Sequence, residues 1–272
     1  MKLALYQART GVDPAANARD LTAAVRDARA GGAAMLFTPE MSGLLDQDRA
    51  RAAAHLKSEE DDIVLAAVRE AAREAGIWVH LGSLALKGGD GGRLVNRGFV
   101  IDEGGAVRAR YEKIHLFDVD LATGESWRES ASYAPGGRAV VTETPLGPLG
   151  LSICYDLRFS GLYAALSAAG AAAVSIPAAF TVPTGEAHWH VLIRARAIES
   201  ACFAVAAAQG GAHEDGRRTY GHSLVVDPWG RVLLDMGNAE REVGFAEIDL
   251  RQLEEVRSRL PVLRHRRPFA AP

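Results

Sequence analysis

The sequence alternates short apolar runs of strand length with longer runs of helical periodicity. It begins with the apolar run Lys2–Gln7, continues with Pro14–Ala30, in which apolar residues recur at helical spacing, and returns to a short apolar run at 34–38. This pattern indicates strands that alternate with helical crossovers. Such an alternation favours a layered α/β fold, in which helices cover the faces of a sheet.

Turn signals indicate hairpins as well as crossovers, so we expect mixed sheets. The glycine-rich stretch Gly88–Gly92 separates two strand-like runs, 77–86 and 94–101, and turns of this kind join antiparallel strands. A second hairpin is expected at 221–234, where 228–230 forms the turn. We expect further strands at 107–115, 140–144, 149–153, 171–176, 202–207 and 243–248, and further helices at 59–75, 156–168, 186–200 and 250–257.

Composition and charge favour a soluble globular protein. Of the 272 residues, 48% are hydrophobic and 24% are charged, and the net charge of -3 favours neither a nucleic-acid nor a membrane partner. Met1–Gln7 is too short for a signal peptide, and Gly170 and Pro177 interrupt the longest apolar stretch. Because the chain has only two cysteines, we expect no disulfide framework and a cytoplasmic location.

The chain shows no linker and no break in composition, so we expect residues 1–272 to form a single domain. Its last segment, 260–272, is basic and interrupted by prolines. We expect this tail to have no regular structure of its own, and a neighbouring subunit is a candidate surface for it.

Cys154 stands where a short buried strand, 149–153, gives way to the helical pattern 156–168. The N–H groups at the start of a helix are unpaired and carry partial positive charge, so they favour a thiolate. They can also hold the oxyanion that forms when a thiolate attacks a carbonyl. The competing interpretation is a small hydrophobe that closes a core strand, which is how we interpret Cys202.

Three further ionisable residues lie at or near the ends of strand patterns, where side chains of a layered sheet converge on one rim: Glu40, Lys113 and Glu129. A thiol of ordinary pKa, about 8.5, needs a base or a cation to react at neutral pH. Glu40 can take the thiol proton, Lys113 can stabilise an oxyanion, and Glu129 can orient Lys113 and the substrate amide. Spacing alone leaves open whether these residues meet, because each type is more often a surface charge.

Histidines offer alternative chemistry. His188 and His190 suggest a zinc site together with Cys154 or His222, but zinc needs three or four ligands, and residues two apart on a helix point to different sides. A cysteine–histidine mechanism through His115 or His222 is the second alternative.

Two arginines, Arg217 and Arg218, lie in the glycine-rich loop 210–221. They can meet a substrate carboxylate, although a solvated pair of loop charges is the more common arrangement.

With these residues the chain resembles the nitrilase superfamily of carbon–nitrogen hydrolases, which carries a Glu–Lys–Cys triad in this order. The matching stretches are Phe37-Thr38-Pro39-Glu40, 111–116 and 150–159, and the resemblance covers essentially the whole chain. It implies a four-layer α-β-β-α sandwich without metal or organic cofactor, and a homodimer or higher homo-oligomer. It assigns the nucleophile to Cys154, the general base to Glu40, oxyanion stabilisation to Lys113 and the backbone N–H of Tyr155, and a second acidic position to Glu129.

The C-terminal half resembles one branch of that superfamily, the deaminated-glutathione amidases and ω-amidases. The stretches 188–189, 192–199, 220–230 and 260–268 carry this resemblance, and the forms at 197–199 and 266–268 favour the deaminated-glutathione side. The implied reaction hydrolyses a non-peptide C–N bond of a small anionic ω-amide through a thioester.

The substrate stays open at this point. Relatives often have Pro-Glu where this chain has Ser160-Gly161, and an acidic residue where it has His190. The alternatives are an ω-amidase for α-ketoglutaramate, another amidase or nitrilase, and a non-catalytic scaffold. The intact set of Glu40, Lys113 and Cys154 argues against the scaffold.

Overall fold

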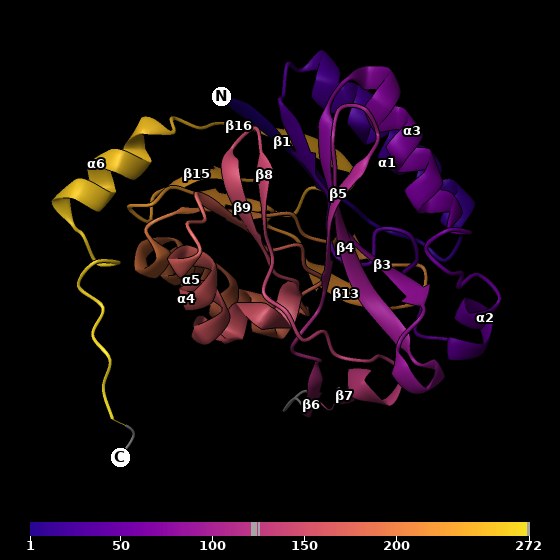
Figure 1. Ribbon diagram of the computed structural model, residues 1–272. Helices are drawn as coiled ribbons and strands as arrows, with labels where there is room; N and C mark the ends of the chain where they lie inside the picture. The colour runs from indigo at the N-terminus through magenta and orange to yellow at the C-terminus, as the bar shows by residue number, and fades with distance from the viewer. Residues whose placement is uncertain (121–123, 125, 271–272) are drawn as a thin grey trace.

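The computed structural model describes residues 1–120, 124 and 126–270, and its two six-stranded sheets pack between two pairs of helices (Figure 1). The first sheet consists of β16 (Glu242–Glu247), β1 (Lys2–Gln7), β2 (Met35–Phe37), β3 (Trp78–Lys87), β4 (Leu94–Ile101) and β5 (Val107–Glu112), in that order. The second consists of β15 (Val232–Asp235), β14 (Leu224–Val226), β11 (Phe203–Ala206), β10 (Ala173–Ser175), β9 (Gly147–Leu151) and β8 (Val141–Thr144).

The helices form the two outer layers. Helices α1 (Pro14–Ala30) and α3 (Ile63–Ala75) cover the first sheet, and α4 (Ser160–Ala168) and α5 (Val182–Ser200) cover the second (Figure 1). The predicted α-β-β-α sandwich is therefore confirmed.

Strand β1 shows why the sheets lie in the middle. Leu3 and Leu5 belong to the core between the sheets, whereas Ala4 and Tyr6 pack in the core beneath the first helical layer. Because successive side chains of a strand point to opposite faces, a strand buried on both faces is apolar throughout. Each large aliphatic side chain that is buried contributes about 1.5–3 kcal/mol, so both cores stabilise the strand.

Each sheet is mixed, as predicted. Strands β1, β2 and β3 are parallel, and β3, β4 and β5 are antiparallel neighbours. In the second sheet β9, β10 and β11 are parallel. The carboxyl ends of parallel strands meet at one edge, so the residues that follow β2 and β9 reach the same region between the sheets.

Several expected helices begin elsewhere; the one expected over 186–200 begins four residues earlier, as α5 at Val182. Helix α3 starts at Ile63 rather than at residue 59, because the Asp62 side chain caps it by accepting the N–H groups of Val64 and Leu65. The helix expected over 156–168 is divided into a 3-10 turn, η3 (Cys154–Arg158), and α4, because Phe159 lies outside the helical region (φ −107°, ψ 87°).

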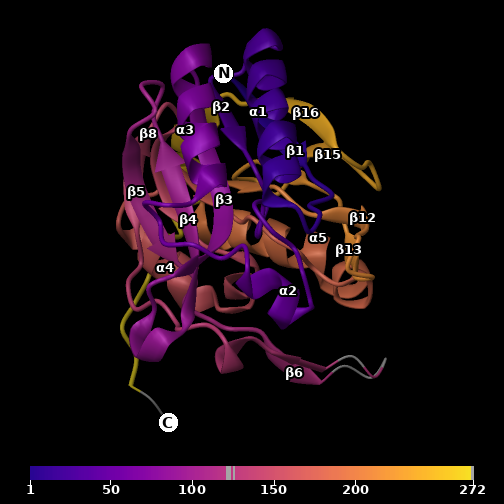
Figure 2. The same ribbon diagram turned by 90° about the vertical axis from the view of Figure 1, so that its right-hand side faces the viewer.

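Several short elements were not predicted, because segments of three to five residues are too short to show periodicity. They include α2 (Arg49–Ala53) and two small hairpins, β6 (Asp118–Asp120) with β7 (Ser126–Arg128), and β12 (Gly210–Ala212) with β13 (Arg218–Tyr220). Figure 2 shows the β6–β7 hairpin projecting at one end of the sandwich.

The C-terminal segment projects from the sandwich as α6 (Arg251–Arg259), and the chain beyond it continues on the side of α4 and α5 (Figure 1). Beyond α6 the chain forms turns and extended backbone, as predicted for the tail, whose last two residues lie outside the described part. Arg266 donates hydrogen bonds to Ala164 O and Ser167 Oγ of α4. The tail is therefore anchored on its own chain.

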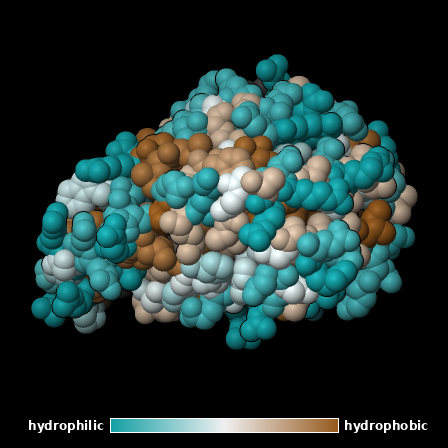
Figure 3. Space-filling view, turned by 90° about the horizontal axis from the view of Figure 1, so that it is seen from above, coloured by the Kyte–Doolittle hydropathy of each residue, from teal (hydrophilic) through white to brown (hydrophobic). Residues whose placement is uncertain are grey.

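The surface seen from above is hydrophilic at its margins, with hydrophobic patches toward the middle (Figure 3). Within the described ranges, every helix is too short or too polar to cross a membrane.

Candidate active site

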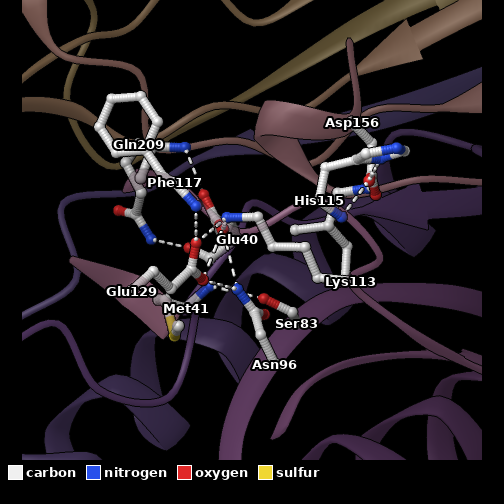
Figure 4. A network of polar contacts seen from close by, with 12 residues as sticks. Glu40, Met41, Ser83, Asn96, Lys113, His115, Phe117, Glu129, Asp156 and Gln209 are labelled. Carbon is white, nitrogen blue, oxygen red and sulfur yellow. Dashed lines mark hydrogen bonds and ion pairs between the residues drawn. The ribbon is translucent and has the colours of Figure 1, made fainter. Parts of the chain in front are cut away.

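Three residues predicted to carry chemistry, Glu40, Lys113 and Glu129, meet in one polar network (Figure 4), and the fourth, Cys154, lines the same cavity. Lys113 Nζ lies 2.9 Å from Glu40 Oε1 and 2.8 Å from Glu129 Oε2. The Cys154 thiol lies beside the Glu40 carboxylate, near enough for this negative charge to raise the thiol pKa. The exposed fractions of Glu40, Lys113 and Cys154 are 4%, 2% and 8%, so water screens this cluster weakly.

Glu40 is placed by the close approach of two neighbouring strands. It follows β2, and Gly82 of β3 lies directly against that segment: a Cβ at Gly82 would lie 2.1 Å from Thr38 O. The next residue, Met41, has a left-handed backbone (φ 55°) and donates its N–H to Ser83 Oγ at 3.0 Å. The chain therefore turns sharply beyond Glu40 and leaves its side chain between the sheets.

Cys154 occupies a strained position at the end of the segment that follows β9. Its φ of 50° is left-handed, which costs an L-residue about 1–2 kcal/mol. Two hydrogen bonds hold this conformation: Cys154 N–H donates to Pro177 O at 2.9 Å, and Ile153 N–H donates to Asp156 Oδ2 at 2.9 Å. The Tyr155 N–H donates to no acceptor in the described part of the protein, so it is available to an oxyanion.

Asp156, which sequence reasoning missed, joins the nucleophile's turn to the segment of Lys113. Its fully buried carboxylate accepts hydrogen bonds from Tyr111 Oη at 2.7 Å and from His115 N at 3.0 Å. It also lies 2.7 Å from His115 Nδ1, and the His115 ring stacks on Phe159 at 3.6 Å. Because the His115 ring contacts Asp156 through Nδ1 and stacks on Phe159, the geometry favours Glu40 over His115 as the base for the thiol.

Asn96 was also missed, although a polar residue inside the apolar run of β4 was a usable signal. Its Nδ2 donates to Glu40 Oε1 at 2.9 Å and to Glu129 Oε1 at 3.3 Å. Two backbone N–H groups complete the shell: Ala179 N donates to Glu40 Oε2 at 3.1 Å, and Phe117 N to Glu129 Oε2 at 2.7 Å. Both carboxylates are therefore held in fixed orientations.

The charges in the cluster follow from burial and mutual contact. Burial alone raises the pKa of Glu40, but the Lys113 charge and hydrogen bonds from Cys154, Lys113 and Asn96 bring this pKa below its usual 4.5. Burial opposes the charge on Lys113, yet Glu129 and Glu40 raise its pKa well above the usual value. Glu40 is therefore ionised at neutral pH, and Lys113 is protonated.

The resting state of Cys154 differs from the expectation. Burial raises the pKa of its thiol, and the neighbouring Glu40 charge raises this pKa further, well above 9.0. The stabilisation of a thiolate that the N–H groups of the turn were expected to supply is therefore outweighed in the resting protein. The physical reason is that a buried carboxylate stands beside the sulfur, and that Cys154 begins a short 3-10 turn rather than an α-helix.

A cavity of about 910 Å³ opens at this cluster, near the upper end of the roughly 300–1,000 Å³ usual for small-ligand sites. Its walls carry more positive than negative groups, which favours an anionic ligand. The lining acids are Glu40, Asp46 and Glu129, and the lining bases are Arg49, Lys87, Arg93, Lys113, Arg128, Arg158, Arg217 and Arg218.

The remaining histidines lie outside this cavity's described lining. His188 Nδ1 lies 3.3 Å from Arg158 Nη1, so it diverges from His190 as predicted for residues two apart on a helix. Asp235 instead lies 2.9 Å from His190 Nε2 and 2.8 Å from His222 Nδ1. Each of these two histidines contacts a different oxygen of the Asp235 carboxylate, and these hydrogen bonds explain why the three side chains lie together.

A thiol, a carboxylate that can take its proton and a charged amine, together in one cavity of a four-layer sandwich, define a hydrolase of the acyl-transfer class. The family model described as "Carbon-nitrogen hydrolase" matches residues 2–258. The chain therefore belongs to the carbon–nitrogen hydrolase family, and the predicted membership of the nitrilase superfamily is confirmed.

Individual relatives agree with this assignment. A deaminated glutathione amidase of Yersinia enterocolitica is 42% identical over 238 residues, covering 87% of this chain and 82% of the relative. The C. elegans NitFhit crystal structure is 38% identical with a TM-score of 0.90; the match covers 98% of this chain but only 65% of that longer one. A glutamate-to-glutamine mutant of an amidase from Nesterenkonia, 28% identical with a TM-score of 0.78 over 96% of this chain and 98% of its own, carries acrylamide added at its active-site cysteine. The predicted enzyme class, a cysteine-dependent amidase that hydrolyses C–N bonds, is confirmed.

Proposed function

We propose that this amidase hydrolyses a small anionic ω-amide, with deaminated glutathione as the leading substrate. The observation that carries the proposal is the buried Lys113 held between Glu40 and Glu129, with the Cys154 thiol beside Glu40. The excess of cationic side chains around the cavity supports an anionic substrate, and the similarity to the deaminated glutathione amidase of Yersinia enterocolitica supports this particular one.

In the first half-reaction Glu40 is the general base. Its carboxylate takes the thiol proton as the Cys154 sulfur attacks the amide carbon, and the carbonyl electron pair moves to oxygen. Lys113 and the Tyr155 N–H stabilise that oxyanion, which preorganised donors do most effectively in a buried site. The intermediate then expels the amine, which receives the proton from Glu40, and the acyl group remains on sulfur as a thioester.

Water completes the cycle after the amine has left. Glu40 takes a proton from water as the oxygen attacks the thioester carbon, and collapse of the second intermediate returns this proton to sulfur. The products are a carboxylic acid and the restored thiol. Glu129 holds Lys113 in place throughout, because two of its contacts bind Nζ directly.

A panel of deaminated glutathione, α-ketoglutaramate, a plain aliphatic amide, a carbamoyl amine and a nitrile tests the substrate, with ammonia and free amines measured separately. We expect release of Cys-Gly from deaminated glutathione with the highest kcat/KM. Ammonia from α-ketoglutaramate alone would instead identify an ω-amidase. No turnover of any anionic ω-amide would overturn the proposal.

The pH dependence follows from the direction of each pKa. Lowering the pH protonates Glu40 only below its usual 4.5, while the raised pKa values of Lys113 and Cys154 keep the ammonium and thiol forms at alkaline pH. We expect kcat/KM to stay flat from about pH 6 to about pH 9 and to fall only in acid. Circular dichroism at each pH separates this fall from unfolding. A half-maximal point above pH 6 on the acid side would contradict the ionisation of Glu40.

We also propose that residues 1–272 form a single domain and that the protein is cytoplasmic. The domain assembles as a homodimer or higher homo-oligomer, and the tail 260–272 lies near a partner subunit. Large exposed hydrophobic side chains support the assembly: Val191 is 68% exposed, Trp229 56% and Phe269 92%. Light scattering on the full chain measures its mass in solution, and a monomer at micromolar concentration would contradict the assembly.

A further inference from the structure

Arg217 is not the solvated loop charge that its sequence context suggested. Its side chain is 17% exposed and lines the catalytic cavity. Arg217 Nε and Nη2 donate to Asp215 Oδ2 at 2.9 Å and 2.7 Å, and the Asp215 side chain is only 1% exposed. A guanidinium tied in this way to a buried carboxylate keeps one orientation.

Arg217 also connects three separate segments of the cavity wall. Its guanidinium carbon lies 5.3 Å from the centroid of the Trp127 ring, within the range of a cation–π contact with the β6–β7 hairpin. Asp215 Oδ2 accepts the N–H of Gln47 at 3.0 Å. Arg217 is thereby fixed both to the hairpin and to the loop that follows Glu40.

The guanidinium retains hydrogen-bonding capacity in this position. Arginine has five N–H donors, and the two contacts to Asp215 leave three of them. Within the described residues Arg217 Nη1 contacts no acceptor. A carboxylate is the ligand that such a planar group binds best, because two parallel hydrogen bonds match its two oxygens.

A second arginine of the cavity belongs to a different segment of the chain. Arg158 belongs to the nucleophile's own turn, and its guanidinium carbon lies 5.8 Å and 5.6 Å from the ring centroids of Tyr155 and Phe180. During the reaction the acyl portion of the substrate stays bonded to Cys154. The amine portion instead takes its proton from Glu40, and Gln47, further along the same loop, donates its N–H to Asp215, the partner of Arg217. These contacts associate Arg158 with the turn of the nucleophile and Arg217 with the segment that follows Glu40.

We propose that Arg217, laid over Trp127, is the binding subsite for a carboxylate on the amine portion of the substrate. The substrate class is then an N-substituted ω-amide whose leaving amine is an amino acid or a short peptide, rather than a primary amide that releases ammonia. This inference rests on the proposed function and extends it to the leaving group. The cavity volume of about 910 Å³ lies near the upper end of the usual range for small-ligand sites, which agrees with a substrate that extends on both sides of the reacting carbon.

The test compares two substrates that differ only at the end of the amine portion. One is deaminated glutathione, and the other is the same molecule with its terminal glycine carboxylate converted to a carboxamide. The measured quantity is the ratio of the kcat/KM values for the two substrates. A substitution that lowers activity on both substrates equally leaves this ratio unchanged. We expect wild-type protein to prefer the carboxylate, and Arg217→Gln to lower this preference about 10- to 100-fold, as a lost charged hydrogen bond does.

Two further variants make the result specific. Arg217→Lys keeps the positive charge but lacks the planar guanidinium, so we expect it to lose less of the preference for the carboxylate substrate. If thermal unfolding shows that Arg217→Gln does not fold, the preference measured for Arg217→Lys decides the test. Arg251→Gln is the matched control, because Arg251 also pairs with the aspartate two residues before it, Asp249, but is 86% exposed and outside the cavity lining. Its preference should equal that of wild type.

An unchanged preference in folded Arg217→Gln would overturn the inference, as would an equal preference for both substrates in the wild type. Either result leaves the proposed function standing, because hydrolysis itself still occurs. A wild-type protein that releases no amine from either substrate would instead contradict the proposed function.

Discussion

Cys154→Ala is expected to lower amide hydrolysis by about 10⁵-fold or more, because removal of a covalent nucleophile eliminates the thioester path. The fold should persist. Alanine has the same backbone preference at φ 50°, and the thiol lies at a cavity wall, so its loss leaves no sealed void. Initial rates and a thermal unfolding curve measure the two effects.

Cys202→Ala provides the matched control. Cys202 is fully buried in the hydrophobic core, and burial raises the pKa of its thiol to about 12. We expect this variant to lose stability by about 1 kcal/mol and to keep its kcat. Undiminished hydrolysis in Cys154→Ala would contradict the mechanism. A substrate-derived adduct found on Cys154 by mass spectrometry would exclude the non-catalytic scaffold.

Lys113→Met is expected to impair activity and stability together. The ammonium stabilises the oxyanion, so its loss should lower kcat about 10²- to 10³-fold. It is also the cation between two buried carboxylates, and removing one partner of a buried ion pair costs about 3–5 kcal/mol. Without it the pKa of Glu40 should rise, so the acid limb of the pH profile should move to higher pH.

The double variant Lys113→Met/Glu129→Gln separates these effects. Replacing Glu129 by a neutral side chain removes one of the two uncompensated charges, so the free energy of unfolding should recover in part. The rate should stay low, because the oxyanion still lacks its cation. Chemical denaturation and steady-state kinetics on the single and double variants measure this. Full recovery of the rate in the double variant would show that Lys113 acts only by holding the fold.

Local patterns were sufficient for the long elements. Lys2–Gln7, Pro14–Ala30 and Leu94–Ile101 have the predicted bounds, because each is long enough to express its period and is bounded by turn residues. The 3-10 turn at Cys154 and the β6–β7 hairpin escaped prediction. Their few residues are held by contacts with distant segments, as Asp156 is by Tyr111 and His115.

The sequence by itself determined the layered α/β class and, through the resemblance, the residues Glu40, Lys113 and Cys154. Tertiary structure alone decided that these residues meet, since 73 positions separate Glu40 from Lys113 along the chain. It also decided their charges, because a pKa depends on burial and on neighbours that no local pattern specifies. For the same reason Arg217, a loop charge in the sequence, becomes a fixed cation of the cavity only where Asp215 and Trp127 hold it.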